Sequence, residues 1–347
     1  MDAVLQLTPQ DRRLACLQVE DRMRLQAASV EKDFWVCWTL RELTAAPGLT
    51  EWVTFKGGTS LSKAWKLIER FSEDIDIVVG KEVLGFGGDA APDRAPSGKQ
   101  RSKRVAALIE ACRRWVQETL QPALAARIAD RLASVRAETE WRLEVDPDAP
   151  DGQCLLFHYG SVFPASEAGY VRPVVKIELG ARSDDWPSEV CHLEPYLTEA
   201  LPQLAADAAF PVRTLVAERT FWEKAMLLHE ETFRPADKQR PIRMARHYYD
   251  LWRLITRGVA ERAAADPALF QRVAAHRKIF FRLSWVDYST HRPGSLRLLP
   301  LDQQLDFWRR DYEAMRGPMF FGEAPDFDEI LRVVGDFERR FNQMAAS

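Results

Sequence analysis

Residues 54–79 read Thr-Phe-Lys-Gly-Gly-Thr-Ser-Leu-Ser-Lys-Ala-Trp-Lys-Leu-Ile-Glu-Arg-Phe-Ser-Glu-Asp-Ile-Asp-Ile-Val-Val, and this stretch decides the fold. Its pattern predicts a strand, a glycine turn, a short helix and a second strand that carries Asp74 and Asp76. Residues two positions apart in a strand point to the same face, so the two carboxylates point together, whereas a helix would separate them by about 200°. Two such carboxylates repel each other strongly unless a cation binds between them or one is protonated. A divalent metal ion is the favoured explanation.

The composition is that of a globular protein with a real core, since 46% of the 347 residues are hydrophobic and 29% are charged. The formal net charge of −3 does not indicate a general nucleic-acid binder, so any basic surface is expected to be local. Five widely spaced cysteines without a Cys-x-x-Cys pair give little support to zinc or a disulfide framework. No secretory signal or membrane-spanning run is evident, and we therefore expect a cytoplasmic protein without a membrane partner.

The pattern along the chain predicts an α/β domain over 1–210 and a helical domain over 211–347. In the first part we expect helices over 10–28, 30–45, 59–70 and about 105–132, strands over 52–55, 74–79, 134–145, 154–162 and 170–179, and a mobile surface loop over 80–103. In the second part we expect helices over 215–232, 242–256, 267–283, 301–315 and 327–344.

A third carboxylate belongs to the candidate metal site. The strand around residues 174–179 alternates cleanly and places Lys176 and Glu178 on one face. With Asp74 and Asp76, Glu178 would supply the hard oxygen ligands that Mg²⁺ prefers. The alternative is that Asp-x-Asp is only the solvated edge of a strand.

The glycine turn is a candidate phosphate-binding segment. Gly57, Gly58 and Thr59 lie between a strand and a helix, where glycines let a phosphate approach the backbone and helix N–H groups are free. Lys63, one turn into that helix, is a possible counter-charge for phosphate. The spacing does not match a Walker A loop or a dinucleotide fingerprint, and a Gly-Gly turn alone is usually only a turn.

These motifs together resemble a known family. Gly-Gly-Thr-x-Leu-x-Lys from Gly57, followed by Ser-Glu-Asp-Ile-Asp-Ile from Ser72, is similar to the AbiEii/AbiGii toxin family of nucleotidyltransferases in the DNA polymerase beta-like superfamily. Glu-Lys-Asp-Phe-Trp-Val from Glu31 and Arg-His-Tyr-Tyr-Asp-Leu-Trp from Arg246 are also similar to it. The resemblance implies an α+β fold, in which a polymerase-beta-like domain with a mixed sheet flanked by helices precedes a helical domain.

The resemblance also implies roles for individual residues. Asp74 and Asp76 would be the paired metal ligands, and Glu178 the third acidic position, where many relatives have aspartate. Gly57, Gly58 and Thr59 would hold the triphosphate, and Ser72 adds a hydroxyl to this nucleotide-binding set.

Two further residues come from the helical part of the resemblance. Lys224 matches a lysine that contacts the nucleotide, and Asp250 matches an acidic residue of the following helix. His247 stands where relatives often have a second aspartate, so only Asp250 can play the acidic part. From the residues alone, Lys224 would more often be exposed, and Asp250 could simply pair with Arg246 or Arg253.

The implied activity is a Mg²⁺-dependent transfer of a nucleoside monophosphate from an NTP, by the toxin of a toxin–antitoxin or abortive-infection pair that defends against phage. In that family the plausible acceptor is the 3′ end of tRNA, which would block translation, and the protein partner is a cognate antitoxin. Two alternatives stay open: a protein or small-molecule acceptor for the same chemistry, and an inactive scaffold that binds nucleotide or antitoxin.

Contact with nucleic acid would need local basic and aromatic residues. The sequence offers two basic segments and three aromatic rings, although charge runs are most often solvated and such rings are mostly core. The candidates are Lys99 to Arg104, the run of Arg234, Lys238, Arg240, Arg243 and Arg246, and the rings of Trp252, Trp285 and Tyr288.

Overall fold

The computed structural model describes residues 1–137, 139–164, 166–167 and 171–344. By its internal contacts the chain divides into two compact units. Unit 1 comprises residues 1–64 and 71–215, and unit 2 comprises residues 65–70 and those from 216 onward. The boundary expected at 210/211 falls inside a strand, β7 (Phe210–Leu215), so the contacts of the sheet unit continue to Leu215.

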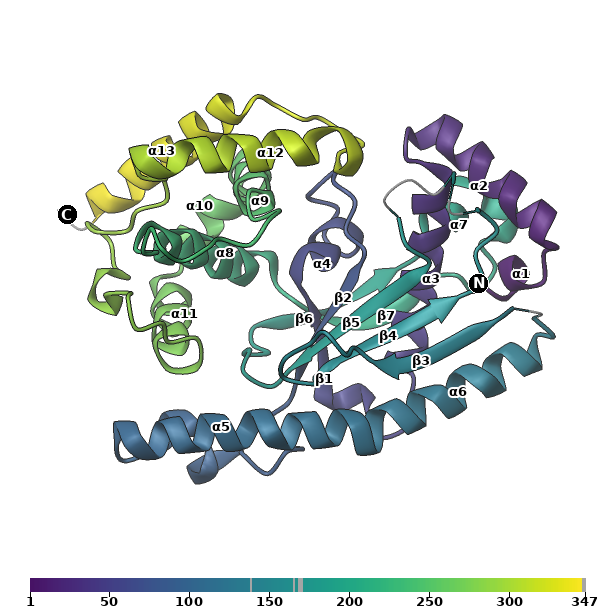
Figure 1. Cartoon of the computed structure of the whole chain (residues 1–347), viewed down its shortest axis with the longest axis horizontal. Coiled ribbons are helices and arrows are strands. Elements are labelled where there is room, and N and C mark those ends of the chain that lie inside the picture. Colours follow the sequence, from purple (N-terminus) through teal and green to yellow (C-terminus); the bar gives the residue numbers. More distant parts are fainter. Residues whose placement is uncertain (138, 165, 168–170, 345–347) are drawn as a thin grey trace. The chain divides into compact units, whose positions relative to one another are not determined.

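Unit 1 is built on one mixed sheet of seven strands, in the order β3-β4-β5-β2-β1-β7-β6 (Figure 1). The pairs β2–β5 and β1–β7 are parallel, and the other neighbouring pairs are antiparallel. This architecture confirms the expected α+β class. The other strands are β1 (Val53–Lys56), β2 (Asp74–Val79), β3 (Trp141–Val145), β4 (Cys154–Tyr159), β5 (Val174–Gly180) and β6 (Ser188–Leu193).

Sequence patterns located five of these strands and missed β6 and β7. Both follow the last segment with clear alternation, and β6 exposes half of its residues and buries only its last, so it lacks an apolar face to detect. The expected strand over 170–179 begins at Tyr170, which lies outside the described residues, and its described part is β5. In the segment expected as a strand over 134–145, Ser134 ends a helix and only Trp141–Val145 is strand; residue 138 is outside the described part.

One face of the sheet is the core of unit 1. Ile75 and Ile77 of β2 are buried, as are their partners Ile177 and Leu179 of β5. The long helix α3 (Ala27–Thr44) packs against this face, where the rings of its two core tryptophans lie 5.8–5.9 Å from Phe157 of β4. The opposite face carries the half-exposed alternate residues of β2 and β5.

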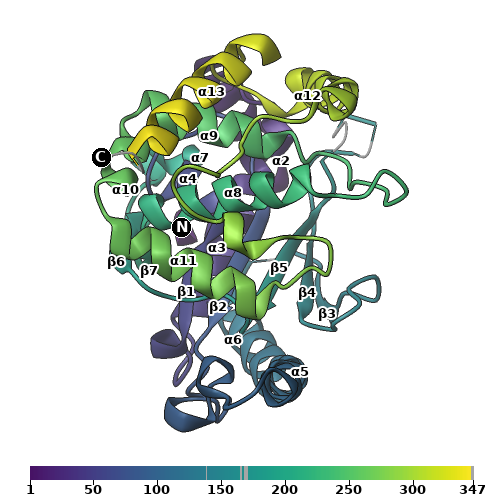
Figure 2. The ribbon, with the colours of Figure 1, turned by 90° about the vertical axis from the view of Figure 1, so that its left-hand side faces the viewer.

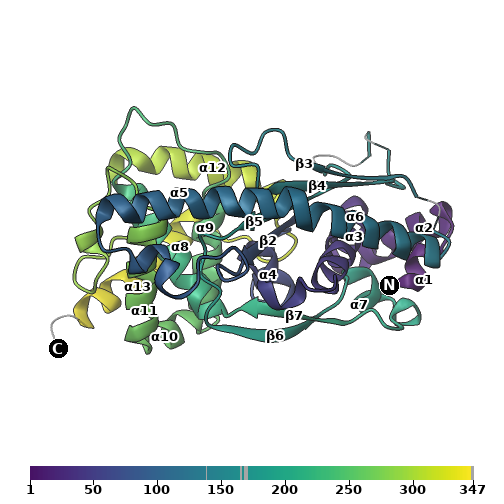
Figure 3. The same cartoon turned by 90° about the horizontal axis from the view of Figure 1, so that it is seen from below.

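The helices of unit 1 differ from expectation at several points: the one expected over 10–28 ends at Met23, and the short α1 and α7 were not expected. The helix expected over 59–70 is shorter, because α4 ends at Lys63 and Lys66 adopts a left-handed φ of 52° that no α-helix tolerates. The basic run at residues 99–104 lies in a helix, not a loop, because Ser97 caps α5 by accepting from the Gln100 N–H. Figure 3 shows α5 and α6 as one nearly continuous run. The remaining bounds are α1 (Asp2–Leu5), α2 (Pro9–Met23), α4 (Gly57–Lys63), α5 (Gly98–Trp115), a π-helical turn (Val116–Leu120), α6 (Gln121–Ser134) and α7 (Tyr196–Ala200).

Unit 2 is helical, as expected, and is drawn in green to yellow in Figure 2. Its core is aromatic: the Trp222 ring lies 4.8 Å from that of Phe270 and 5.0 Å from that of Phe341. Patterns missed the short α10, which a left-handed Gly258 separates from α9. The helices are α8 (Ala217–Thr232), α9 (Arg246–Thr256), α10 (Val259–Ala264), α11 (Pro267–Phe280), α12 (Leu305–Met319) and α13 (Phe327–Gln343). Among the described residues no helix has the length and apolar character needed to span a membrane.

Candidate functional site

The candidate site in unit 1 lies on the half-exposed face of the sheet. Strand register pairs Asp76 with Glu178 of β5 on one side and with Lys56 of β1 on the other. Asp74 pairs with Lys176 of β5. Directly opposed residues share a face, so the carboxylates of Asp74 and Asp76 point together, as the spacing predicted. Lys176 of β5 thus lies beside Asp74, and Lys56 of β1 lies beside Asp76.

Gly57 brings the start of α4 against the second of these acids. Its φ is +83°, and a Cβ atom there would lie 2.0 Å from Oδ2 of Asp76. Only glycine combines this backbone conformation with so close an approach. The Gly-Gly motif and the Asp-x-Asp motif thus meet in space, which the spacing alone could only suggest.

Thr59 and Ser72 hold the same corner together. The buried Thr59 hydroxyl donates to the backbone carbonyl of Asp74 at 2.5 Å and lies 2.9 Å from the Ser72 hydroxyl. These contacts fix the start of β2 relative to α4. The side chain of Thr59 is therefore used in the fold, and any contact of Thr59 or Ser72 with a nucleotide stays a prediction.

The carboxylates fit a magnesium site of the kind that substrate phosphates complete. Mg²⁺ is usually held by one or two carboxylates plus phosphate oxygens and waters, and Asp74 and Asp76 supply such a pair. Within the part of the chain that the structure describes, no three acidic, histidine or cysteine residues gather closely enough to hold a metal. Glu178 lies opposite Asp76 in the sheet, and its Oε1 pairs with Lys176 Nζ at 3.0 Å. A role for Glu178 as a third ligand stays a prediction.

Lys63, the expected phosphate counter-charge, is buried and paired within unit 1. Its side chain is 2% exposed, its Nζ is 3.0 Å from Asp33 Oδ1, and it lies 3.3 Å from the centre of the Tyr196 ring. Asp33 also accepts from the Tyr196 N–H at 2.7 Å. The expectation overlooked Asp33, which sits thirty positions earlier in the chain. These contacts give Lys63 a structural role in fastening α4 to α3, and they do not favour the phosphate role.

Unit 2 contains the other two candidate catalytic residues in direct contact. Lys224 of α8 lies with its Nζ 2.9 Å from Oδ2 of Asp250 in α9, and their side chains are 9% and 0% exposed. Lys224 was expected to be exposed, and this expectation is wrong because its ammonium reaches the buried carboxylate. Arg70 is the second partner of Asp250, with Nε 2.7 Å from Oδ1 and Nη2 2.9 Å from Oδ2.

Sequence reasoning missed Arg70. It offered Arg246 and Arg253 as partners of Asp250 because they are near on the same helix, whereas Arg70 is 180 positions away. Arg253 instead pairs with Glu69 at 2.8 Å. No local signal in the sequence marks such a long-range pair.

The electrostatics of this cluster follow from its burial. Burial alone would raise the pKa of Asp250, but Arg70 and Lys224 lower it well below the usual value, so the carboxylate is ionised at neutral pH. Burial lowers the pKa of Lys224, and the attraction of Asp250 opposes that shift. Burial also lowers the pKa of His247, further reduced by Lys224 and Arg246. His247 is therefore neutral and supplies no negative charge in place of a second aspartate.

Some of the candidates for nucleic-acid contact are committed to contacts within the fold, and others are exposed. Arg234 and Arg240 both pair with Glu231, at 2.6 and 2.8 Å, and Trp252 is buried, so these three have roles in the fold. Trp285 is half-exposed, with Lys238 Nζ 4.7 Å from its ring centre. Lys99 and Lys103 are exposed on α5. Stacking or phosphate contact stays open for these exposed residues.

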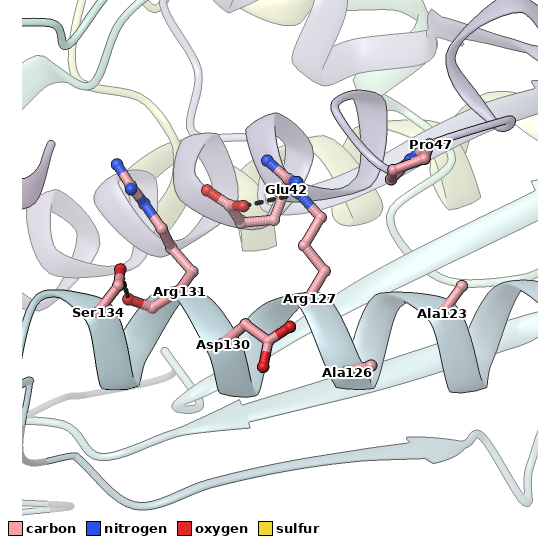
Figure 4. A pocket seen from close by; sticks show the side chains of 8 residues that line it. All are labelled: Glu42, Pro47, Ala123, Ala126, Arg127, Asp130, Arg131 and Ser134. Carbon is pink, nitrogen blue, oxygen red and sulfur yellow. Dashed lines mark hydrogen bonds and ion pairs between the residues drawn. The ribbon is translucent and has the colours of Figure 1, made fainter.

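A surface cavity of about 460 Å³ lies away from these residues, between α3 and α6 of unit 1 (Figure 4). Two of its charged groups are paired: Glu42 Oε2 is 2.9 Å from Arg127 Nε, and Arg131 pairs with Asp2, which lies outside the lining. Its lining is Glu42, Pro47, Ala123, Ala126, Arg127, Asp130, Arg131 and Ser134.

A mixed sheet with an Asp-x-Asp strand held against a Gly-Gly-Thr helix start is the arrangement expected of a nucleotidyltransferase. The family model described as "Nucleotidyl transferase AbiEii toxin, Type IV TA system" matches residues 38–333, and the chain therefore belongs to this family of type IV toxin–antitoxin nucleotidyltransferase toxins. Membership implies an NTP substrate and an antitoxin partner. The resemblance drawn from the motifs is confirmed.

A solved structure is similar over nearly the whole chain. MenT4, a nucleotidyltransferase toxin from Mycobacterium tuberculosis, is 15% identical with a TM-score of 0.51, covering 96% of this chain and 88% of its own. At that identity the likeness shows the fold alone. No curated protein matches the chain in sequence.

Proposed function

We propose that this toxin transfers a nucleoside monophosphate from an NTP to the 3′ end of tRNA in a Mg²⁺-dependent reaction, and that the modified tRNA no longer supports translation. One observation carries the proposal: Asp74 and Asp76 share the half-exposed face of the sheet, and Asp76 lies against the bare backbone of Gly57. This pair holds negative charge where a metal–nucleotide complex could reach it.

The reaction is an in-line displacement at the α-phosphorus. A hydroxyl oxygen of the acceptor forms a bond to that phosphorus as the bond to the oxygen bridging the α- and β-phosphates breaks, the hydroxyl proton passes to solvent, and pyrophosphate leaves. Asp74 and Asp76 would hold the metal, which supplies charge neutralisation on the phosphates when it is bound. Lys224 would contribute a positive charge toward the nucleotide.

The tRNA acceptor rests on family resemblance and on basic residues that the fold leaves exposed. Lys99 and Lys103 are exposed on α5, and Lys238 is exposed beside the ring of Trp285. Such residues suit the phosphates of a nucleic acid. A protein or small-molecule acceptor would use the same chemistry and is separated from tRNA by experiment.

The test is transfer of label from each of the four α-labelled NTPs, with Mg²⁺, to purified tRNA, total RNA or total cell protein. We expect label in tRNA, at its 3′ end, and none with an Asp74→Asn/Asp76→Asn double variant. Label in protein alone would overturn the tRNA acceptor. Label that persists in the double variant would overturn the metal assignment.

A further inference from the structure

Lys176 of β5 lies between two carboxylates on the half-exposed face of the sheet. Its Nζ is 3.0 Å from Oε1 of Glu178, two residues along the same strand, and 3.6 Å from Oδ2 of Asp146, which follows the last residue of β3. The side chains of Lys176 and Glu178 are 35% and 43% exposed, whereas that of Asp146 is 9% exposed. All three residues belong to unit 1. Lys176 thus joins a half-exposed acid to a buried one.

Asp146 is the fixed member of this group. Its backbone N–H donates to the carbonyl of Cys154 in β4 at 2.9 Å, so the residue continues the pairing of β3 with β4. Its Oδ1 accepts from the N–H of Asp148 at 3.0 Å, which closes a local turn and orients the carboxylate. The other oxygen, Oδ2, is the one that lies near Lys176. The ammonium of Lys176 is therefore attracted to an acid that the fold holds in place.

The order of the strands shows the direction in which this ammonium leans. In the sheet, β5 lies between β4 and β2, and β3 lies beyond β4. Because Asp146 follows β3, the ammonium of Lys176 reaches over β4, away from the strand that carries Asp74 and Asp76. Register places Glu178 beside Asp76, yet its Oε1 contacts the same ammonium. The ion pair thus draws this oxygen of Glu178 toward the β4 side.

We propose that Lys176 is a positioning residue that acts through Glu178: it restrains this carboxylate and so keeps it out of the metal site. Of the three acids, Asp74 and Asp76 alone would then hold the metal. A carboxylate that enters an octahedral Mg²⁺ site takes a position that a phosphate oxygen or a water would otherwise occupy. Restraint of Glu178 therefore leaves room for the nucleotide. The inference rests on the proposed function in one respect, that the aspartate pair holds the metal.

The first test is a double-mutant cycle on the affinity for Mn²⁺ without nucleotide, measured from the free ion by electron paramagnetic resonance. Mn²⁺ takes the same oxygen ligands as Mg²⁺. We expect Lys176→Met to bind Mn²⁺ about fivefold more tightly than the wild type, a modest change because half-exposed ion pairs hold weakly. In a Glu178→Gln background the same change should alter the affinity less than about twofold. Equal gains in both backgrounds would overturn the inference, since Lys176 would then act through its charge alone.

The single variants carry the same prediction. Glu178→Gln by itself should change the affinity for Mn²⁺ less than about twofold, because the carboxylate is held outside the site. A loss of about tenfold would make Glu178 a third ligand and overturn the restraint. An affinity in Lys176→Met that is equal to or lower than that of the wild type would overturn it as well. Damage to the fold would weaken metal binding, so it cannot produce the expected gain.

A conservative variant and a matched control separate the ion pair from the loss of any cation. Lys176→Arg keeps a cation that can pair with Glu178 and should bind Mn²⁺ as the wild type does; a gain like that of Lys176→Met would overturn the inference. The control is Arg142, an exposed cation on the same face of the sheet, which pairs with Glu144 at 2.9 Å. Arg142→Met should leave the affinity unchanged, and a fivefold gain there would overturn the assignment to Lys176.

Metal binding without nucleotide also separates this inference from the proposed function. The gain in Lys176→Met should vanish in an Asp74→Asn/Asp76→Asn background, because the metal has then lost its holders. A gain that persists there would overturn the inference, since the ion would bind elsewhere. The expected gains in a protein that transfers no nucleotide to any acceptor would sustain the link from Lys176 to the metal site and refute the proposed function instead.

Discussion

The aspartates of β2 and the aspartate of α9 are the same residue type put to opposite uses. Asp74 and Asp76 share a half-exposed face of the sheet, where Lys176 and Lys56 lie opposite them in the neighbouring strands. Asp250 is fully buried and has two cations of the chain in contact with it. The difference teaches that the sheet presents half-exposed acids, Asp74 and Asp76, which we call the open pair. Unit 2 instead contains a buried, prearranged ion-pair cluster of Arg70, Lys224 and Asp250, which we call the closed cluster.

The largest expected effect comes from breaking the open pair. Asp76→Asn keeps the shape of the side chain but removes a metal-holding charge, so nucleotide transfer should fall by at least about 10³-fold. The side chain is half-exposed, so the melting temperature should barely change. Asp148→Asn, at an exposed acid between β3 and β4, is the control and should keep full activity. Substantial activity in Asp76→Asn would remove Asp76 from the chemistry.

Breaking the closed cluster should act on stability first. Asp250→Asn removes the buried carboxylate that both Arg70 and Lys224 contact, which should lower the free energy of unfolding by about 3–5 kcal/mol. Urea denaturation measures this loss. Asp336→Asn on α13 is the matched control, since Asp336 pairs only with exposed arginines and should lose less than about 1 kcal/mol. Similar losses in both variants would show that the ion pairs of Asp250 add no more stability than exposed ion pairs do.

The pH dependence of the free energy of unfolding gives a second test of the Asp250 ion pairs. The pKa of Asp250 is lowered in the folded chain, so its contribution is complete above the unfolded value of about 4 and is lost as pH falls below it toward the lowered native value. The stability gap between wild type and Asp250→Asn should therefore stay constant from pH 7 to about pH 5 and narrow only in stronger acid. A gap that narrows already near pH 6 would contradict this assignment.

A smaller effect is expected where the two motifs of the open site meet. Gly57→Ala adds a Cβ 2.0 Å from the Asp76 carboxylate at a φ of +83°, and should both reduce transfer and lower the free energy of unfolding by about 1–3 kcal/mol. Gly85 has a similar φ of +79° with nothing near its Cβ position. Gly85→Ala therefore measures the cost of the left-handed backbone conformation alone, without a steric contact. Equal activity in the two variants would mean that the contact with Asp76 is unimportant.

The smallest loss of nucleotide transfer is expected for a change at Glu178, the candidate third metal ligand. Glu178 pairs with Lys176 and joins no three-residue metal cluster among the described residues, so Glu178→Gln should reduce transfer less than about tenfold. Steady-state rates at saturating NTP and Mg²⁺ measure this. A loss as large as that of Asp76→Asn would restore Glu178 as a third ligand.

Sequence reasoning succeeded where the chemistry is local. The alternation in residues 74–79 gave the strand, its buried face and the shared direction of Asp74 and Asp76, because a period of two is written directly in the chain. The helices of unit 2 likewise followed from their apolar spacing, with only the short α10 missed.

It failed where a residue's environment depends on distant partners. Lys63 looked available for phosphate because Asp33 is not near it in sequence, and Lys224 looked exposed because nothing in α8 announces Asp250. The pairing of Arg70 with Asp250 was out of reach for the same reason. Burial of a charge is decided by tertiary contacts, and a single sequence does not contain them.

The most direct test of the open site is Mg²⁺-dependent NTP binding, measured by calorimetry with a non-hydrolysable analogue of the nucleotide that the transfer assay selects. The wild type should bind it at least about 100-fold more tightly with Mg²⁺ than with a chelator, and the Asp74→Asn/Asp76→Asn variant should lose that metal dependence. Equal affinity with and without Mg²⁺ in the wild type, or an undiminished metal effect in the double variant, would contradict the claim that this pair of carboxylates holds the metal–nucleotide complex.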